Sequence, residues 1–416
     1  MKRLLSLLLV IAMLFGVCTV FTACDGSSAS SEKEEEKEEK KSNRVKLSMK
    51  GVTLEEGVVY KGNGITLTAK EIEIDGDYIE VYFDLENTSS EYRIVDSSDV
   101  VVNGISSCGY GFYQSLYGGE SYEVSLSFYV PELELLQVKT IGHIDFYLDI
   151  YDDYYNNLTT QEKVTVNTSE KGFVHTQKYD GEVLFEKKGI RVTLIETSFK
   201  KNETHGMYLL VENENSKYVH VSANQFMING WWLPYGGFYA NLQANTNAVV
   251  LLELSDLDFL GVKKEKDIQN VSFGIWAYDE EYDDIFDVET VSYAPGAEDF
   301  VKELDVGEDV LYEDDIDIVL YKLTAEGQPV VKLYIKNNTD GSCSVELTNW
   351  TVNGYEAYGS AYLTLPANAQ CIYTIYLNPE FKVESPEELD SIKTNLHLIC
   401  HSNYKDVVET LTLPLD

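Results

Sequence analysis

The sequence is poor in basic residues and in proline, and each shortage narrows the possible functions. Its 416 residues include 32 Lys and Arg against 70 Asp and Glu, which gives a formal net charge of −38. Proteins bind nucleic acid, a polyanion, through a basic face, so we expect no nucleic-acid partner. Only 8 prolines accompany 30 tyrosines, and 44% of the residues are hydrophobic. This composition favours packed, strand-rich domains over a disordered polymer.

Motifs of catalysis and of tight metal binding are also missing. The sequence contains no nucleophile elbow, phosphate-binding loop, paired zinc cysteines or His-Glu-x-x-His segment. We therefore predict a protein that is not an enzyme and that uses no cofactor and no metal. A calcium-dependent or enzymatic factor is the less favoured alternative, because carboxylates cluster at 152–153 and 279–284 and loop carboxylates can bind calcium. In so acidic a chain we expect these clusters to be solvated loops.

One long hydrophobic run is present, and it lies at the N-terminus. Lys2 and Arg3 precede an apolar stretch over residues 4–20, as in a secretory signal. The stretch leads into Phe-Thr-Ala-Cys, with Cys24 as its last residue. This segment resembles the lipobox of bacterial lipoproteins, and the resemblance implies a signal peptide over 1–23 and a lipid on Cys24. Because more than one acyl chain anchors a protein stably, we expect a lipid-anchored protein on the extracytoplasmic face of the cell membrane.

The rest of the chain contains a threefold repeat. Sixteen residues separate Asn87 from Asn103, and the same spacing recurs in the two later copies, at Asn213 and Asn229 and at Asn337 and Asn353. The repeat period is 126 residues and then 124 residues. Self-similarity of this kind indicates copies of one domain. We predict a disordered Ser/Glu/Lys tether over 24–45, followed by repeats over 46–169, 170–296 and 297–416.

Each repeat has the pattern of an antiparallel β-domain. Segments such as 79–85 and 330–335 alternate with period two, which places one face toward a core. Asn-Gly at 103–104, 229–230 and 353–354 is typical of a tight hairpin turn. The spacing resembles the tandem immunoglobulin-like domains of Gram-positive surface lipoproteins, many of unknown function. The resemblance implies an all-β fold of three immunoglobulin-like sandwiches and implies no chemistry.

An aromatic segment in the second repeat is the candidate ligand-binding site. Trp231 and Trp232 are adjacent, and neighbours in an extended segment point to opposite faces, so both cannot fill one core. We therefore expect one of them to be exposed and to bind a ligand together with Tyr235. Phe238 is excluded from the site, because Phe112, Phe238 and Tyr362 each follow their repeat's turn asparagine by nine residues, which suggests a shared core aromatic.

The cysteines of the third repeat permit at most one internal disulfide. Cys343, Cys371 and Cys400 all lie in the third repeat, which leaves one thiol over, and Cys108 lies alone in the first. The pairing itself cannot be deduced from the sequence.

Taken as a whole, the sequence predicts a non-catalytic, membrane-anchored extracytoplasmic lipoprotein. Its three domains would serve for binding or for spacing at the cell surface. The expected partners are the membrane, through the N-terminal lipid, and a neutral cell-wall glycan or an extracellular protein, because an acidic body repels anionic polymers. The alternative form of this hypothesis is a carbohydrate-binding module that uses the aromatic residues of the second repeat.

Overall fold

The computed structural model describes residues 44–106, 109–173, 175, 181–199, 205–234, 236–254, 257–403 and 405–415. These residues belong to one compact unit, 43–416. The predicted signal peptide, nearly all of the predicted tether, Cys24, Cys108 and Tyr235 lie outside the described residues. No helix in the described part of the chain is long and apolar enough to cross a membrane.

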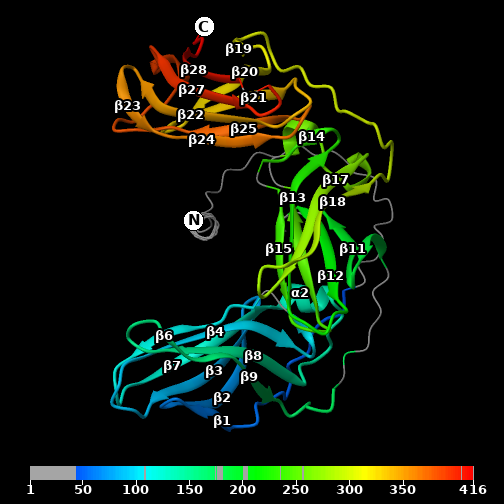
Figure 1. Ribbon diagram of the computed structural model, residues 1–416, viewed down its shortest axis with the longest axis vertical. Helices are drawn as coiled ribbons and strands as arrows, with labels where there is room; N and C mark the ends of the chain where they lie inside the picture. The colour runs from blue at the N-terminus through cyan, green and yellow to red at the C-terminus, as the bar shows by residue number, and fades with distance from the viewer. Residues whose placement is uncertain are drawn as a thin grey trace, which may run out of the picture. The chain divides into compact units, whose positions relative to one another are not determined.

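The fold is all-β, as predicted, and its strands surround three hydrophobic cores. The strands around the first core form the first sandwich (Figure 1). They are β1 (Gly57–Gly62), β2 (Ile65–Asp75), β3 (Tyr78–Asn87), β4 (Arg93–Val102), β5 (Ile105–Ser106), β6 (Tyr113–Leu116), β7 (Ser121–Tyr129), β8 (His143–Tyr151) and β9 (Asn157–Asn167). One sheet has the order β1-β2-β3-β7, and the strands β5-β4-β8-β9, with β6 on β4, face it.

The second sandwich repeats this arrangement. Its strands are β10 (Glu182–Lys187), β11 (Ile190–Ser198), β12 (Gly206–Asn213), β13 (Val219–Ile228), β14 (Trp231–Trp232), β15 (Phe238–Leu242), β16 (Asn247–Glu253), β17 (Val271–Asp279) and β18 (Asp284–Tyr293). One sheet has the order β10-β11-β12-β16, and the other has the order β14-β13-β17-β18 with β15 on β13. All pairings within each sandwich are antiparallel, whereas a single parallel pair, Asn247 with Ile105, joins β16 to β5.

The third sandwich has the same plan with one additional short strand. Its strands are β19 (Val310–Glu313), β20 (Ile316–Ala325), β21 (Pro329–Asn337), β22 (Cys343–Val352), β23 (Tyr355–Tyr358), β24 (Ala361–Leu365), β25 (Gln370–Tyr376), β26 (Asn378–Pro379), β27 (Ile392–Cys400) and β28 (Lys405–Thr412). The sheet β19-β20-β21-β25 faces the sheet β26-β23-β22-β27-β28, which carries β24 on β22.

Helical structure in the described residues is short. It comprises α2 (Val130–Leu135) and the 3₁₀ turns η1 (Leu257–Leu260), η2 (Glu265–Asp267) and η3 (Pro386–Glu388). Pro131 lies in the first turn of α2, where its missing N–H costs no hydrogen bond. The fold therefore depends on strand pairing and on burial of the strands' inner faces.

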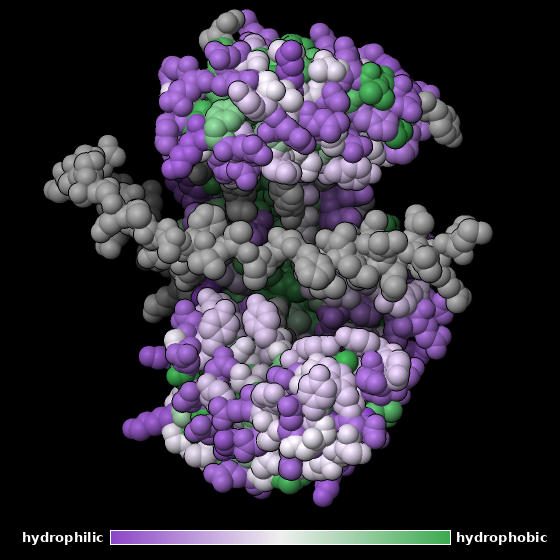
Figure 2. Space-filling view, turned by 90° about the vertical axis from the view of Figure 1, so that its left-hand side faces the viewer, coloured by the Kyte–Doolittle hydropathy of each residue, from purple (hydrophilic) through white to green (hydrophobic). Residues whose placement is uncertain are grey.

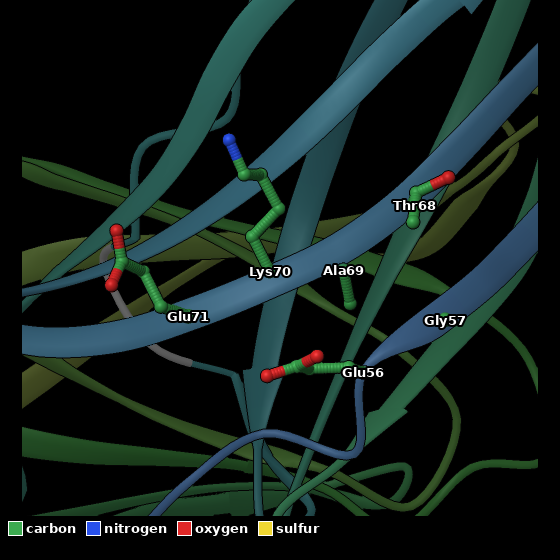
Figure 3. A pocket seen from close by; sticks show the side chains of 6 residues that line it. All are labelled: Glu56, Gly57, Thr68, Ala69, Lys70 and Glu71. Carbon is green, nitrogen blue, oxygen red and sulfur yellow. The ribbon is translucent and has the colours of Figure 1, made fainter.

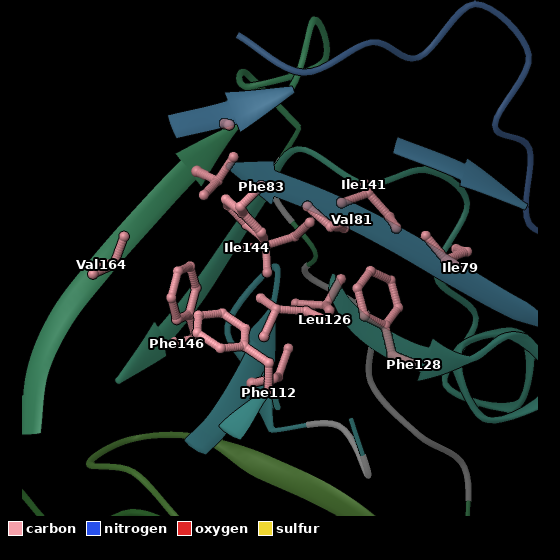
Figure 4. Close-up of a cluster of buried hydrophobic side chains, with 14 of the residues drawn as sticks. Ile79, Val81, Phe83, Phe112, Leu126, Phe128, Ile141, Ile144, Phe146 and Val164 are labelled. Atoms are coloured by element: carbon pink, nitrogen blue, oxygen red, sulfur yellow. The ribbon is translucent and has the colours of Figure 1, made fainter. Parts of the chain in front are cut away.

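The cores are formed by the residues that alternate along the strands. In β3, Ile79, Val81, Phe83 and Leu85 are fully buried, whereas the residues between them face outward. Figure 4 shows Phe83 among Phe112, Phe146 and other side chains of this core, and its ring centroid lies 5.6 Å from that of Phe146. Burial of such side chains contributes about 1.5–3 kcal/mol each.

The first repeated landmark is a buried asparagine at the end of one strand in each sandwich: Asn87, Asn213 and Asn337. Each side-chain Nδ2 donates to two or three backbone carbonyls at 2.7–3.3 Å. Each Oδ1 accepts from the backbone N–H two residues later at 2.9–3.0 Å. The amide thus satisfies backbone groups where the chain leaves the sheet, so these asparagines are structural.

The second landmark forms the predicted hairpin turn in all three copies. Asn103, Asn229 and Asn353 have φ between 51° and 53°, and the glycines that follow have φ between 78° and 84°. Positive φ at both central residues defines the turn that joins two closely paired strands, and it explains the choice of Asn-Gly. Each asparagine side chain also accepts two backbone N–H bonds and donates one bond near the start of β8, β17 or β27.

The third sandwich contains the predicted disulfide. Cys343 on β22 is bonded to Cys400 on β27, so the bridge joins neighbouring strands of one sheet. Cys371 is a buried free thiol on β25. The prediction of one bridge and one remaining thiol in this repeat is confirmed.

Candidate functional site

The predicted exposure of one tryptophan in the second repeat is wrong, because both indoles are buried. Trp231 is 2% exposed and Trp232 is 7% exposed. Neighbouring side chains on β14 do point in opposite directions, as expected. Trp231 enters the core of the second sandwich, however, and Trp232 enters the core of the third. The second face of β14 is thus covered by the next sandwich, which the pattern of a single repeat could not show.

The tryptophan contacts identify a packing role for β14. The Trp231 Nε1 donates to the backbone carbonyl of Lys302 at 2.7 Å, and its ring lies 5.7 Å from that of Tyr334 on β21. These residues have no exposed ring face to offer to a ligand, and we withdraw them as a binding site. Tyr235, the third predicted member, lies outside the described residues.

The predicted shared core aromatic is correct for the first repeat and wrong for the third. Phe112 is 8% exposed and packs on Phe83 in the first core, whereas Tyr362 is 72% exposed. The segment between the Asn-Gly turn and β24 is one residue shorter than the segment between the Asn-Gly turn and β15. The core position next to β22 is therefore occupied by Ala361, which is fully buried opposite Leu347.

When the three repeats are aligned by the pairing of their strands, an exposed tyrosine occupies the same position in each sandwich. Tyr113, Tyr239 and Tyr362 are 55%, 51% and 72% exposed. Each lies on the outer face of the second sheet, beside the central strand of that sheet. The register partners on the central strand are Asp96, Ser222 and Glu346, respectively.

The second sandwich carries the largest group of aromatic rings on this face. Three rows of residues cross β15, β13 and β17, which are neighbours in the sheet (Figure 1). The rows are Asn241–His220–Tyr278, Tyr239–Ser222–Trp276 and, on two strands only, Asn224–Gly274. The alternate residues Val219, Val221, Ala223, Ile275 and Ala277 are buried in the core. We call His220, Tyr239, Trp276, Tyr278 and Tyr282 the aromatic face.

His220 is the centre of a ring stack on this face. Its ring centroid lies 4.7 Å from that of Tyr278, 5.7 Å from that of Tyr239 and 6.3 Å from that of Tyr282, with interplanar angles of 13–28°. Its Nδ1 lies 2.7 Å from the Asn241 Oδ1 and within hydrogen-bonding distance of the Tyr239 hydroxyl. Because Asn241 Oδ1 can only accept, the Nδ1 carries the proton, and Nε2 is an acceptor with no partner among the described residues.

The electrostatics of the aromatic face keep it uncharged at neutral pH. Burial lowers the pKa of His220, although the Asn241 hydrogen bond and the charges of Glu280 and Asp279 oppose this shift. Burial also raises the pKa of Tyr239, and a hydrogen bond to Tyr278 adds to the effect. The imidazole of His220 is therefore neutral and the phenol of Tyr239 is protonated.

The equivalent faces of the other sandwiches are charged. In the first, Asp96 and Asp149 face each other across β4 and β8, and burial with the charge of Asp149 raises the pKa of Asp96. In the third, the Nε2 of His397 lies 3.0 Å from Asp406 Oδ1 and its Nδ1 lies 3.5 Å from Glu346 Oε2. The same backbone position thus presents three different chemistries.

The acidic clusters form turns. Asp152 Oδ1 accepts the backbone N–H groups of Tyr154 and Asn156, each at 2.9 Å. Asp279 Oδ1 accepts those of Glu281 and Asp283 at 3.0 and 3.1 Å. Among the described residues, no group of three or more His, Cys, Asp or Glu side chains is placed to hold a metal ion.

A shallow hollow of about 590 Å³ lies on the first sandwich (Figure 3). Its lining includes Glu56, Thr68 and Lys70, next to a bulge in β2. Lys70 Nζ already pairs with Asp84 at 3.2 Å and with Glu123 at 2.9 Å. The hollow is therefore a weaker candidate than the aromatic face.

Sequence reasoning missed the aromatic face, although a signal was present. Trp276 and Tyr278 alternate along β17 with the buried residues Ile275 and Ala277, so they lie on the side of the strand away from the core. This alternation in the sequence indicates an aromatic pair on the outward side of the strand. On the side of the molecule in Figure 2, by contrast, hydrophilic residues predominate and hydrophobic ones form small separate areas.

Comparison with protein-family models and with curated proteins gives no match. Among solved structures, the chain is similar to Escherichia coli alpha-2-macroglobulin activated by porcine elastase, at 13% identity and a TM-score of 0.16. That similarity covers 84% of this chain and 33% of the macroglobulin chain. The chain thus spans about a third of that structure, and a TM-score this low supports no inference about function.

Proposed function

We propose that this chain is a non-catalytic, lipid-anchored binding protein of the extracytoplasmic membrane face. Cys24 would carry the lipid after removal of residues 1–23, and residues 24–45 would be a disordered tether. Three immunoglobulin-like repeats, over 46–169, 170–296 and 297–416, would then present their outer sheet faces to a cell-wall glycan or an extracellular protein. The proposal of an anchor rests on the charged start, the apolar run and Cys24 in the sequence.

The observation that supports binding is the aromatic face of the second sandwich. Large side chains exposed on a sheet cost solubility and contribute nothing to a core, so their concentration on one uncharged face favours recognition. Tyr239 is 51% exposed and Tyr282 is 71% exposed, and both belong to the stack centred on His220.

Anchoring is tested in cells with the full-length chain. The wild type should incorporate a radiolabelled fatty acid and sediment with membranes, whereas Cys24→Ala should do neither. Cys371→Ala, which removes a thiol from the buried core, is the matched control and should keep the label. A Cys24→Ala protein that retains the label would contradict the proposed anchor.

Binding is tested with residues 25–416, which contain the whole compact unit. Fluorescently labelled protein should bind to intact cells or isolated cell walls. Tyr239→Ala combined with Trp276→Ala should abolish that binding, whereas Tyr113→Ala combined with Tyr362→Ala changes the equivalent faces and should preserve it. Unchanged binding of the Tyr239/Trp276 variant would refute the assignment of recognition to this face.

A further inference from the structure

Trp276 differs from the other rings of the aromatic face in having no aromatic neighbour among the described residues. The rings of Tyr239, His220, Tyr278 and Tyr282 cover one another's faces in the stack. Trp276 is half-buried, and its register partner on β13 is Ser222, whose small side chain is 7% exposed.

The residues beside Trp276 are small, and the groups around them are both apolar and polar. The neighbouring position on β17 toward its N-terminal end is Gly274, and a methyl group of Val288 and the amide oxygens of Asn224 and Gln225 lie close above that glycine. Val288 is 60% exposed. An indole between a small serine and a glycine has room for a flat ligand on its ring, whereas bulky neighbours would exclude one.

Polar groups with open hydrogen-bonding capacity lie in the adjacent row. The Nε2 of His220 and the Nδ2 of Asn241 have no hydrogen-bond partner among the described residues, nor has the Nε1 of Trp276. A purely apolar ligand would leave these groups dehydrated and unpaired, which costs free energy. The ligand must therefore combine a flat apolar side with hydroxyl or amide groups at its edge.

Charge decides between the remaining ligand classes. The turn next to Tyr278 carries Asp279, Glu280, Glu281, Asp283 and Asp284, and the chain as a whole carries −38. This field opposes anionic ligands. A cation would be drawn to the turn and to Asp284, which ends the Tyr278 row on β18. The row of Trp276 itself, Tyr239–Ser222–Trp276, carries no carboxylate. An uncharged ligand fits the face best.

We propose that the aromatic face binds a neutral oligosaccharide, with one pyranose ring stacked on Trp276 and hydroxyl groups hydrogen-bonded to His220 and Asn241. The C–H groups on one side of a pyranose ring form the flat apolar surface, and the ring's hydroxyls supply the polar edge. This inference rests on the proposed function, because it names the ligand class of the same face.

The test is calorimetric titration of residues 25–416 with hexasaccharides. The neutral probes are hexamers of glucose, of mannose and of N-acetylglucosamine. A galacturonate hexamer is the anionic probe, and a glucosamine hexamer is the cationic one. At least one neutral hexamer should bind. Trp276→Ala should then weaken binding by at least about tenfold, or 1.4 kcal/mol, whereas Trp276→Phe should retain part of the affinity. Tyr362→Ala should leave binding within about twofold, and circular dichroism should show that every variant is folded.

Three outcomes would overturn this inference. They are no binding of any neutral hexamer, binding of a charged hexamer only, and neutral binding that Trp276→Ala does not change. The cell-binding experiment above separates this failure from failure of the proposed function. If the Tyr239/Trp276 variant loses cell binding while the neutral hexamers do not bind, the face recognises another ligand, and the proposed function stands.

Discussion

The three buried tryptophans provide a quantitative test of the packing described above. Trp231, Trp232 and Trp350 are all buried, but only Trp231 has a hydrogen bond for its indole N–H among the described residues. We consider the same substitution, Trp→Phe, at each position. The change in side-chain volume is then identical, so differences between the variants report the fate of the N–H group.

The expected difference follows from the hydrogen-bonding states. At Trp231 the substitution removes a 2.7 Å bond to the Lys302 carbonyl, which contributes about 0.5–1.5 kcal/mol. At Trp232 and Trp350 it removes a buried N–H without a partner, and such a group costs about 1–3 kcal/mol while it is present. We therefore expect Trp231→Phe to destabilise the protein more than the other two variants, by about 1.5–4.5 kcal/mol.

Urea unfolding of residues 25–416, followed by far-ultraviolet circular dichroism, measures the effect, because this signal does not depend on the tryptophan removed. The midpoint of the transition should fall most for Trp231→Phe. The reasoning is refuted if Trp231→Phe has a midpoint equal to or above those of Trp232→Phe and Trp350→Phe.

Three further predictions concern single polar groups. Burial raises the pKa of Asp99, and hydrogen bonds from Gln243 and Tyr218 oppose this shift. Because the folded protein binds the proton more tightly, folding stability should fall as pH rises above 3.8. In thermal unfolding scans, Asp99→Asn should stabilise the protein at pH 7, and this increment should disappear near pH 3.8. Burial lowers the pKa of His220, so stability should fall as pH drops below 6.5, and His220→Gln should flatten that part of the pH profile; a profile unchanged by the substitution would contradict the burial of the imidazole. Asn213→Ala removes three amide-to-carbonyl bonds and one accepted bond and should cost about 2–4 kcal/mol in chemical unfolding. The same change at the half-buried Asn241, which removes one hydrogen bond to His220, should cost about 1 kcal/mol.

The repeat and the strand faces could be predicted because local patterns determine them. Asn-Gly turns require positive φ at both positions, so Asn103, Asn229 and Asn353 identified equivalent hairpins without knowledge of the fold. The period-two segments likewise identified buried faces such as that of β3. These features depend only on residues within a few positions of one another.

Other features depend on contacts between distant parts of the chain, and these the sequence did not reveal. A β-bulge lies four residues before each Asn-Gly turn, and its residues Asp99, Gln225 and Asn349 have positive φ. These three residues share no side-chain type, so the sequence does not reveal the bulge. The burial of Trp232 depends on residues of the third sandwich, roughly a hundred positions later in the chain. The segment before β24 is one residue shorter than its equivalent in the second repeat, so counting from the turn asparagine aligned Tyr362 with Phe238 instead of Tyr239. The repeated exposed tyrosine became visible only through strand pairing.

The repeated tyrosine shows how one fold can present surfaces of different chemistry at one position. Strand register fixes the exposure of Tyr113, Tyr239 and Tyr362, because each lies on the outer face beside a central strand. The partners across the central strand are not fixed in this way, since outward side chains make no contact with the core. They form an Asp96–Asp149 pair, a Ser222–Trp276 pair and a Glu346–His397 pair. A ligand that stacks on an uncharged indole would meet carboxylates at the first face and at the third, and burying those charges costs more than a stacked ring contributes. Under the proposed function, stacking of a ligand is therefore confined to the second sandwich, and exchanging Trp276 for Asp should abolish it more completely than exchange for Ala.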